Sequence, residues 1–172
     1  MSESYVVPPA TDIGHIHLKV SDIERALAFY HGVLGFDIVA RVGDHAAFVS
    51  AGGYHHHIGL NTWHSRGAPP PPTRATGLYH FAIRYPTRRD LAVAVVRVIQ
   101  AGVPLHGASD HGISEAIYLA DPDGNGIELM WDRPREVWPR NADGSLLIAM
   151  ADPLDVESLL ALVEDDAGEP GA

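Results

Sequence analysis

The stretches that decide the fold are Gly14-His15-Ile16-His17-Leu18-Lys19-Val20 and Leu78-Tyr79-His80-Phe81-Ala82-Ile83-Arg84. In each, an early histidine opens a run in which every second residue is apolar, the pattern of a β-strand with one buried face. Because successive strand side chains point to opposite faces, His15 and His80 lie opposite the apolar side of their strands. The two histidines are 65 residues apart. We predict that they occupy equivalent positions in an internal repeat.

Composition indicates a globular protein of ordinary size. The chain has 172 residues, of which 46% are hydrophobic, and it contains no cysteine. This length suits one domain with a sizeable core, and the lack of cysteine leaves histidine and carboxylate side chains as metal ligands. A formal net charge of −10 argues against nucleic acid or an anionic membrane as partner. Without a membrane-length apolar run or a secretory signal pattern, a cytoplasmic location is expected.

The same signals follow each histidine strand in the same order. Ser21-Asp22-Ile23-Glu24 and Thr87-Arg88-Arg89-Asp90 both predict a capped helix start, with a hydroxyl residue followed three positions later by an acid. Gly35 and Gly102 predict the helix ends. Strand candidates then follow at 36–42, 46–50 and 55–61, and again at 103–105, 115–120 and 126–131. A period shared by strands, caps and glycines predicts a duplicated βαβββ unit.

We divide this single α+β domain into four segments. A first βαβββ module spans residues 12–61 and a second spans 77–132. The connection at 62–76 contains four successive prolines, which lack a backbone donor and exclude regular structure there. Residues 133–172 form a C-terminal extension with one helix. Asp152-Pro153-Leu154-Asp155 is predicted to open that helix, with proline in its favoured first turn.

Glu128 completes a candidate metal site. It lies in a strand whose residues Ile127, Leu129 and Trp131 share one face, so its carboxylate points to the other face. One strand histidine or glutamate is more often an ordinary polar residue, but here three occur at positions that the repeat relates. His15, His80 and Glu128 make a set of two histidines and one carboxylate. Such a set binds a divalent metal on one side and leaves positions for substrate and oxygen.

These motifs resemble the vicinal-oxygen-chelate superfamily, which includes glyoxalases, extradiol catechol dioxygenases, fosfomycin-modifying enzymes and bleomycin-binding proteins. The resemblance covers about residues 12–132 and is nearest to single-pair members similar to catechol 2,3-dioxygenase. The matching stretches are His15 to Asp22, Phe29-Tyr30 to Leu34-Gly35-Phe36, His80, and Asp121-Pro122-Asp123-Gly124-Asn125 before Glu128. It implies paired βαβββ modules in a curved mixed sheet around a metal cup. His15 is preferred to His17 as ligand because His15 is in register with His80.

The resemblance also indicates which residues would decide the chemistry. Glyoxalase-type sites place a fourth metal ligand on the strand at 55–61, whereas extradiol dioxygenases place a proton-handling histidine there. His57 is the candidate for either role. Tyr118, ten residues before Glu128, matches a tyrosine that contacts the substrate hydroxyl in extradiol enzymes. A further active-site histidine is expected before that strand, with His111 as the candidate and His106 as a weaker alternative.

The function implied is that of an extradiol dioxygenase, which cleaves a small aromatic diol with O2. Fe(II) is the expected metal, with Mn(II), Ni(II) and Zn(II) as alternatives. Two neutral imidazoles and one carboxylate leave Fe(II) positively charged, which favours the catecholate anion. His57 would then transfer a proton and Tyr118 would orient a ring oxygen.

Two other functions stay open on the same fold. The first is a glyoxalase-like isomerase or lyase with His57 as fourth ligand. The second is a protein that binds an antibiotic or another small molecule. The predicted metal triad counts against this second function. The common bacterial catechol enzymes have two module pairs and this chain has one, which leaves the substrate open. A homodimer is compatible with the resemblance, because many relatives are dimers.

Overall fold

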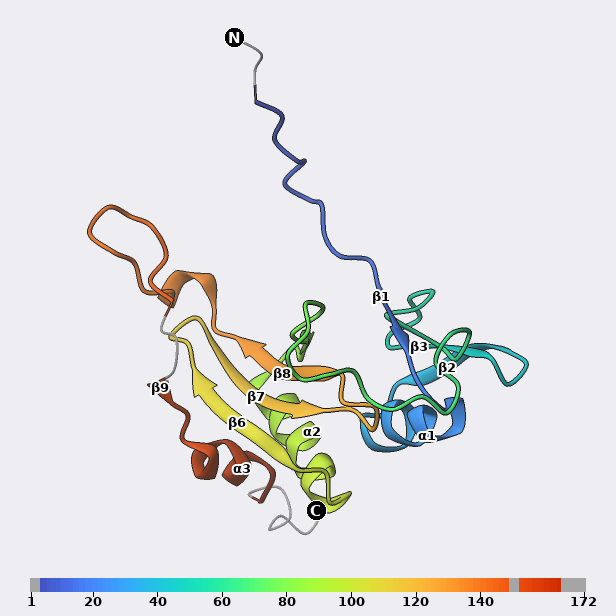
Figure 1. Ribbon diagram of the computed structural model, residues 1–172. Helices are drawn as coiled ribbons and strands as arrows, with labels where there is room; N and C mark the ends of the chain where they lie inside the picture. The colour runs from blue at the N-terminus through green and yellow to red at the C-terminus, as the bar shows by residue number, and fades with distance from the viewer. Residues whose placement is uncertain (1–3, 149–151, 165–172) are drawn as a thin grey trace.

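The computed structural model describes residues 4–148 and 152–164, and its strands form two sheets (Figure 1). The four-stranded sheet has the order β1-β4-β3-β2 and the five-stranded sheet has the order β5-β8-β7-β6-β9. The first sheet contains β1 (Ile16–Lys19), β2 (Asp37–Val42), β3 (Ala46–Ser50) and β4 (Ile58–Asn61). The second contains β5 (Phe81–Arg84), β6 (Leu105–Asp110), β7 (Ser114–Ala120), β8 (Gly126–Asp132) and β9 (Asp152–Pro153).

The two sheets repeat one pattern of pairing. The first strand of each module pairs in parallel with the last, so that Ile16 faces Ile58 and Phe81 faces Ile127. The other neighbours within each sheet are antiparallel. The prediction of an α+β fold built from two βαβββ modules is therefore confirmed. The strands form two sheets, since the edge strands β1 and β5 do not pair with each other in the described part of the chain.

The helices begin close to the predicted positions. Helix α2 (Arg88–Gln100) has the predicted capping box, in which the Thr87 hydroxyl accepts from Asp90 N at 3.0 Å and the Asp90 carboxylate accepts from Thr87 N at 3.2 Å. Helix α1 (Ile23–Leu27) needs a correction. Its cap is Asp22 rather than Ser21, because the Asp22 carboxylate accepts from Arg25 N at 2.8 Å.

A wider turn lengthens the first helix. After α1 the chain continues as a π-helix, η1 (Ala28–Val33), in which Leu34 N donates to Phe29 O at 2.9 Å. Gly35 and Gly102 follow the two helical segments with φ angles of 84° and 70°. These left-handed conformations favour glycine, so both predicted helix ends are confirmed.

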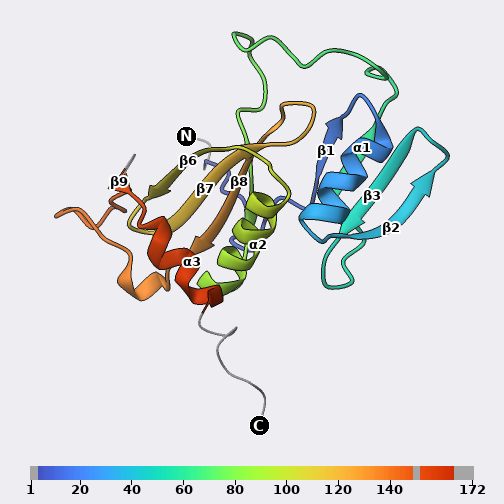
Figure 2. The same cartoon turned by 90° about the horizontal axis from the view of Figure 1, so that it is seen from below.

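The C-terminal helix begins later than predicted. Pro153 lies in β9, where it pairs with Ser109 of β6, rather than in a helical first turn. Helix α3 (Val156–Glu164) starts after Asp155, whose carboxylate accepts from Ser158 N at 2.9 Å. A short 3-10 helix, η2 (Arg135–Val137), precedes this region. Figure 2 shows α1 across the first sheet and α2 beside α3 across the second.

Buried side chains of both modules form one hydrophobic cluster. Each buried aliphatic or aromatic side chain of this kind contributes roughly 1.5–3 kcal/mol to folding. A polar contact joins the modules at the edge of the cluster: the Arg97 guanidinium of α2 donates to Val33 O at 2.7 Å and to Gly32 O at 2.8 Å. A cation at these last carbonyls complements the dipole of the first helix. In the described part of the chain, no helix has the length and apolar character needed to cross a membrane.

Tyr85 provides a test of this interior. Its Oη is buried without a hydrogen-bond partner among the described residues. Burial raises the pKa of Tyr85 to about 12, partly opposed by the charge of Arg97. The folded chain therefore holds this proton more tightly than the unfolded chain. Its contribution to stability is complete below about pH 10 and is lost towards pH 12, a loss of roughly 2–3 kcal/mol.

We expect Tyr85→Phe to leave the free energy of unfolding at pH 8 unchanged or to raise it by roughly 1 kcal/mol, because the buried hydroxyl has no partner. The variant should also lose less stability than the wild type between pH 8 and pH 11. Urea unfolding at the two pH values measures both effects. A variant that is destabilised at pH 8 would show that the hydroxyl has a favourable contact.

Candidate metal centre

His80 and Glu128 lie side by side on the second sheet. His80 immediately precedes β5, and Glu128 pairs in register with Ala82 of that strand. The distance from His80 Nε2 to Glu128 Oε2 is 2.9 Å. Glu128 is only 9% exposed. A buried carboxylate requires a hydrogen-bond donor or a cation nearby. The imidazole of His80 supplies a hydrogen-bond donor to Glu128.

Tyr118 and His111 extend this pair into a group of four. Tyr118 lies on β7 directly opposite Glu128, and its ring centroid is 5.6 Å from that of His80. Its Oη lies 2.7 Å from Nε2 of His111. Burial, together with the negative charge of Glu128, raises the pKa of Tyr118. The phenol therefore stays protonated at neutral pH, and His111, not His106, is the histidine bonded to it.

His15 lies in a different group of side chains, on the first sheet. Its ring centroid is 4.4 Å from that of His56 and 6.4 Å from that of His55. The Nδ1 atoms of His55 and His56 are 2.8 Å apart. Burial and the neighbouring histidines, His15 foremost, lower the pKa of His56. The lowered pKa favours the neutral imidazole of His56.

His57 contacts other partners. Its Nδ1 lies 3.0 Å from Ser50 Oγ and accepts from Ala51 N at 3.3 Å. Its ring centroid is 4.8 Å from that of Tyr54. Strand β4 begins at Ile58, so His57 precedes the strand in which it was predicted to lie. Among the three successive histidines, it is His56 whose ring lies close to His15.

The strand register identifies Gly59 as the first-module counterpart of Glu128. Gly59 pairs with His17, the second residue after His15, as Glu128 pairs with Ala82, the second residue after His80. A Cβ on Gly59 would lie 3.0 Å from the His17 ring. The glycine thus makes room for an imidazole and brings no metal ligand to this position.

The predicted ligands are divided between the two sheets. Within residues 4–148 and 152–164, no three histidine, aspartate or glutamate side chains are grouped closely enough to hold a metal ion. His80 and Glu128 are adjacent, whereas His15 precedes an edge strand of the other sheet. The adjacent donor atoms and the buried carboxylate fit two ligands of one divalent ion, and a second imidazole is the donor type that completes such a set.

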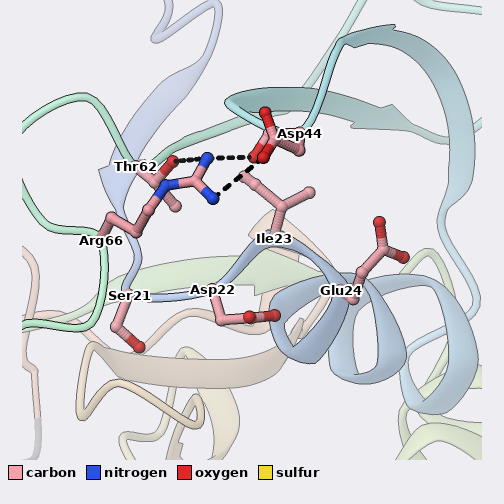
Figure 3. Close-up of a pocket in the computed structure, with 7 residues that line it drawn as sticks. All are labelled: Ser21, Asp22, Ile23, Glu24, Asp44, Thr62 and Arg66. Carbon is pink, nitrogen blue, oxygen red and sulfur yellow. Dashed lines mark hydrogen bonds and ion pairs between the residues drawn. The ribbon is translucent and has the colours of Figure 1, made fainter.

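A cavity of about 210 Å³ lies beside Ser21, which follows β1, whereas His15 precedes that strand. Figure 3 shows the side chains that line it. The cavity is lined by Ser21, Asp22, Ile23, Glu24, Asp44, Thr62 and Arg66. The guanidinium of Arg66 in this cavity already has a partner, since its Nη1 donates to Asp44 Oδ2 at 2.9 Å. None of the predicted site residues lines this cavity, so it is separate from the candidate centre.

Two relatives provide a comparison by sequence. The chain is 40% identical over 157 residues to a catechol-2,3-dioxygenase of Bacillus subtilis (strain 168), covering 91% of this chain and 53% of that protein. It is 28% identical over 120 residues to biphenyl-2,3-diol 1,2-dioxygenase 3 of Rhodococcus globerulus, covering 70% of this chain and 63% of the relative. The chain thus spans between half and two thirds of the length of these curated relatives.

Comparison with solved structures and with family models agrees on the fold. A glyoxalase/dioxygenase from Nostoc punctiforme superposes with a TM-score of 0.61 at 21% identity, covering 77% of this chain and 100% of the other. The model of the Glyoxalase/Bleomycin resistance protein/Dioxygenase superfamily matches residues 12–129. That match covers the first module, the connection and the second module as far as Leu129 in β8, and the chain therefore belongs to the glyoxalase/bleomycin resistance protein/dioxygenase superfamily.

Proposed function

We propose that the protein is a metal-dependent extradiol dioxygenase that cleaves the ring of a small aromatic diol with O2. The observation that carries the proposal is the group of His80, Glu128, Tyr118 and His111, in which two metal-donor side chains adjoin a protonated phenol and an imidazole. Two relatives whose names describe dioxygenases of aromatic diols support the same reaction.

The metal in this proposal is Fe(II), with Mn(II), Ni(II) or Zn(II) as alternatives. His80 and Glu128 would hold it as adjacent ligands, and His15 of the first sheet is the expected third ligand. When bound, such an ion supplies Lewis acidity that favours the ionised diol, and open coordination positions. The charge of Glu128 is suited to this role because a buried carboxylate without a nearby cation is unfavourable. Asp or Glu with two imidazoles is the donor set that iron oxygenases of this type use.

Side chains of the chain itself would position the substrate and move protons. Tyr118 Oη would donate a hydrogen bond to a ring oxygen, and His111, 2.7 Å away, would hold the phenol in place. His56 lies beside His15 and its lowered pKa favours the neutral imidazole, so we assign to it the acceptance of the proton of the diol hydroxyl. His57 stays a candidate for the same step, although Ser50 and Ala51 engage its Nδ1.

One observation weighs against the glyoxalase-like alternative. That reaction would use a fourth ligand from the last strand of the first module. The first-module counterpart of Glu128 is Gly59, which has no side-chain donor, and Nδ1 of His57, the predicted fourth ligand, already contacts Ser50 and Ala51. The dioxygenase, which needs three protein ligands, is therefore favoured.

The direct test is an oxygen-uptake assay. The protein is purified without oxygen, its bound metal is identified, and catechols are added with O2. Fe(II)-loaded protein is expected to consume oxygen and form a yellow ring-cleavage product. An iron-loaded protein that consumes no oxygen with a panel of catechols would exclude the proposal. Tightly bound nickel or zinc, with isomerase activity, would favour the alternative.

Substitution of neighbouring histidines separates their roles. We expect His56→Phe to lower kcat by roughly 10²–10⁴-fold, the range for loss of a general base, while metal content is retained. His57→Phe tests the other candidate for this step, and His64→Phe, at an exposed position outside this group of histidines, serves as the control. Turnover lost in His57→Phe but not in His56→Phe would return the proton-transfer role to His57. Metal lost in His57→Phe would make it a ligand.

A further inference from the structure

Gly126 is the point at which β8 passes very close to the segment that carries His80. A Cβ on Gly126 would lie 2.3 Å from Tyr79 O, 3.1 Å from His80 Cβ and 3.3 Å from His80 Cα. The nearest of these atoms is backbone, so it cannot rotate away as the end of a side chain would. Any larger residue at this position must move His80 and β8 apart.

This close approach bears on the pair formed by His80 and Glu128. Glu128 is two residues beyond Gly126 on the same strand, and its Oε2 is 2.9 Å from His80 Nε2. Groups that share one ligand or ion need to be held within roughly 0.5 Å of their working positions. Gly126 thus allows the strand that carries Glu128 to approach the backbone of His80 this closely.

The turn before Gly126 is held rigidly by one buried carboxylate. Asp121 is 5% exposed. Its Oδ1 accepts from Asp123 N at 2.9 Å and from Asn125 N at 2.8 Å. Its Oδ2 accepts from Asn125 Nδ2 at 2.8 Å. Acceptance by one carboxylate of two backbone amides of the turn closes it and determines where β8 begins.

Two side chains of the first module are bonded to this turn. Tyr30, which is fully buried on η1, donates from Oη to Asp121 Oδ2 at 2.9 Å. Arg25 of α1 donates from Nη2 to Asp123 Oδ1 at 2.5 Å. Burial and the Asp121 charge raise the pKa of Tyr30 far above its ordinary value, so its hydroxyl remains a donor.

We propose that the turn from Asp121 to Gly126 is a positioning element that couples the first module to the pair of His80 and Glu128. Tyr30 and Arg25 fix the position of the turn. Because Gly126 lies against the backbone of His80, a shift of the turn would also shift His80. The expected effect of this element on metal binding rests on the proposed metal centre. The structural coupling between the turn and His80 is independent of that proposal, because its contacts are between side chains and backbone of the protein itself.

The test uses Gly126→Ala and Tyr30→Phe in the full chain, each with a matched control. Gly77→Ala is the glycine control, because a Cβ there meets nothing within 4 Å. Tyr85→Phe is the tyrosine control, since its buried Oη has no partner among the described residues. The measurements are Co(II) affinity by visible absorption, and the imidazole ¹⁵N resonances of His80 in the metal-free protein.

We expect Gly126→Ala and Tyr30→Phe to weaken Co(II) binding about tenfold or more, as losses of supporting contacts around metal ligands do. Both should shift the His80 resonances, and the controls should do neither. If Tyr30→Phe lowers stability but leaves the Co(II) affinity and the His80 resonances unchanged, the contact is structural only and the proposal is overturned. The same variant decides the matter if Gly126→Ala does not fold.

Failure of the proposed function would look different. A wild-type protein that binds Co(II) and Fe(II) but cleaves no diol would end the dioxygenase proposal and leave the positioning role intact. If the wild type binds no metal, the His80 resonances in Tyr30→Phe still decide whether the turn positions that histidine.

Discussion

Replacement of Glu128 by Gln is expected to abolish metal binding and to lower ring-cleavage activity by roughly 10³-fold, the effect typical of removing an electrostatic contact at a reacting centre. Gln has the shape of Glu but no negative charge. Glu128 is 9% exposed and lies 2.9 Å from His80, so the variant keeps the packing and the hydrogen-bonding capacity. Metal content and oxygen uptake measure the two losses.

The control for this variant is Glu136→Gln, an exposed glutamate of η2. It should behave as the wild type in both assays. The unfolding midpoint of metal-free Glu128→Gln is expected to change little, because a neutral amide replaces a desolvated carboxylate. A Glu128→Gln protein that retains full metal content would contradict the ligand role of Glu128.

Replacement of Glu115 by Ala is expected to lower the free energy of unfolding by roughly 3–5 kcal/mol, the cost of breaking a buried ion pair on one side. Glu115 is 4% exposed on β7. Its Oε2 accepts from Arg88 Nε at 2.7 Å, and its Oε1 lies 3.2 Å from Arg133 Nη2. The substitution leaves two partly buried guanidinium groups without this anion. Urea unfolding measures the loss.

The same ion network reaches the candidate centre. Arg133 Nη2 also donates to Asp110 Oδ2 at 2.5 Å, and Asp110 Oδ1 accepts from Gly112 N at 2.8 Å. His111 lies between these two residues and contacts Tyr118. Loss of Glu115 should therefore reduce activity as well as stability. Glu157→Ala, at an exposed position of α3, is the matched control. An unchanged unfolding curve for Glu115→Ala would mean that the two arginines find other partners.

Strand alternation explains why much of the second-module site could be predicted. Tyr118 and Glu128 lie within regular strands, where the direction of a side chain follows from its position in the run. Their pairing across β7 and β8 then places both on the face of the sheet where His80 lies. The alternation of side chains along each strand was sufficient to predict that Tyr118 and Glu128 share a face, because the two residues belong to neighbouring strands of one sheet.

The first-module histidines could not be assigned in this way. Residues 55–57 precede β4, so alternation does not determine which of three successive imidazoles turns towards His15. Contacts with Ser50 and Tyr54 draw His57 away and leave His56 beside His15. The late start of α3 has a similar cause, since Pro153 pairs with β6 through a contact distant in sequence.

The sequence by itself determined the duplicated βαβββ fold, the histidine at the start of each module and the carboxylate on β8. These features follow from short-range periodicity, caps and turns, which act within a few residues. Only the tertiary structure decided that His80 adjoins Glu128 while His15 lies with His56, and that Gly126 brings β8 against His80. The reason is that these relations depend on how separate strands approach one another, and the approach is decided by packing and by buried contacts between the modules.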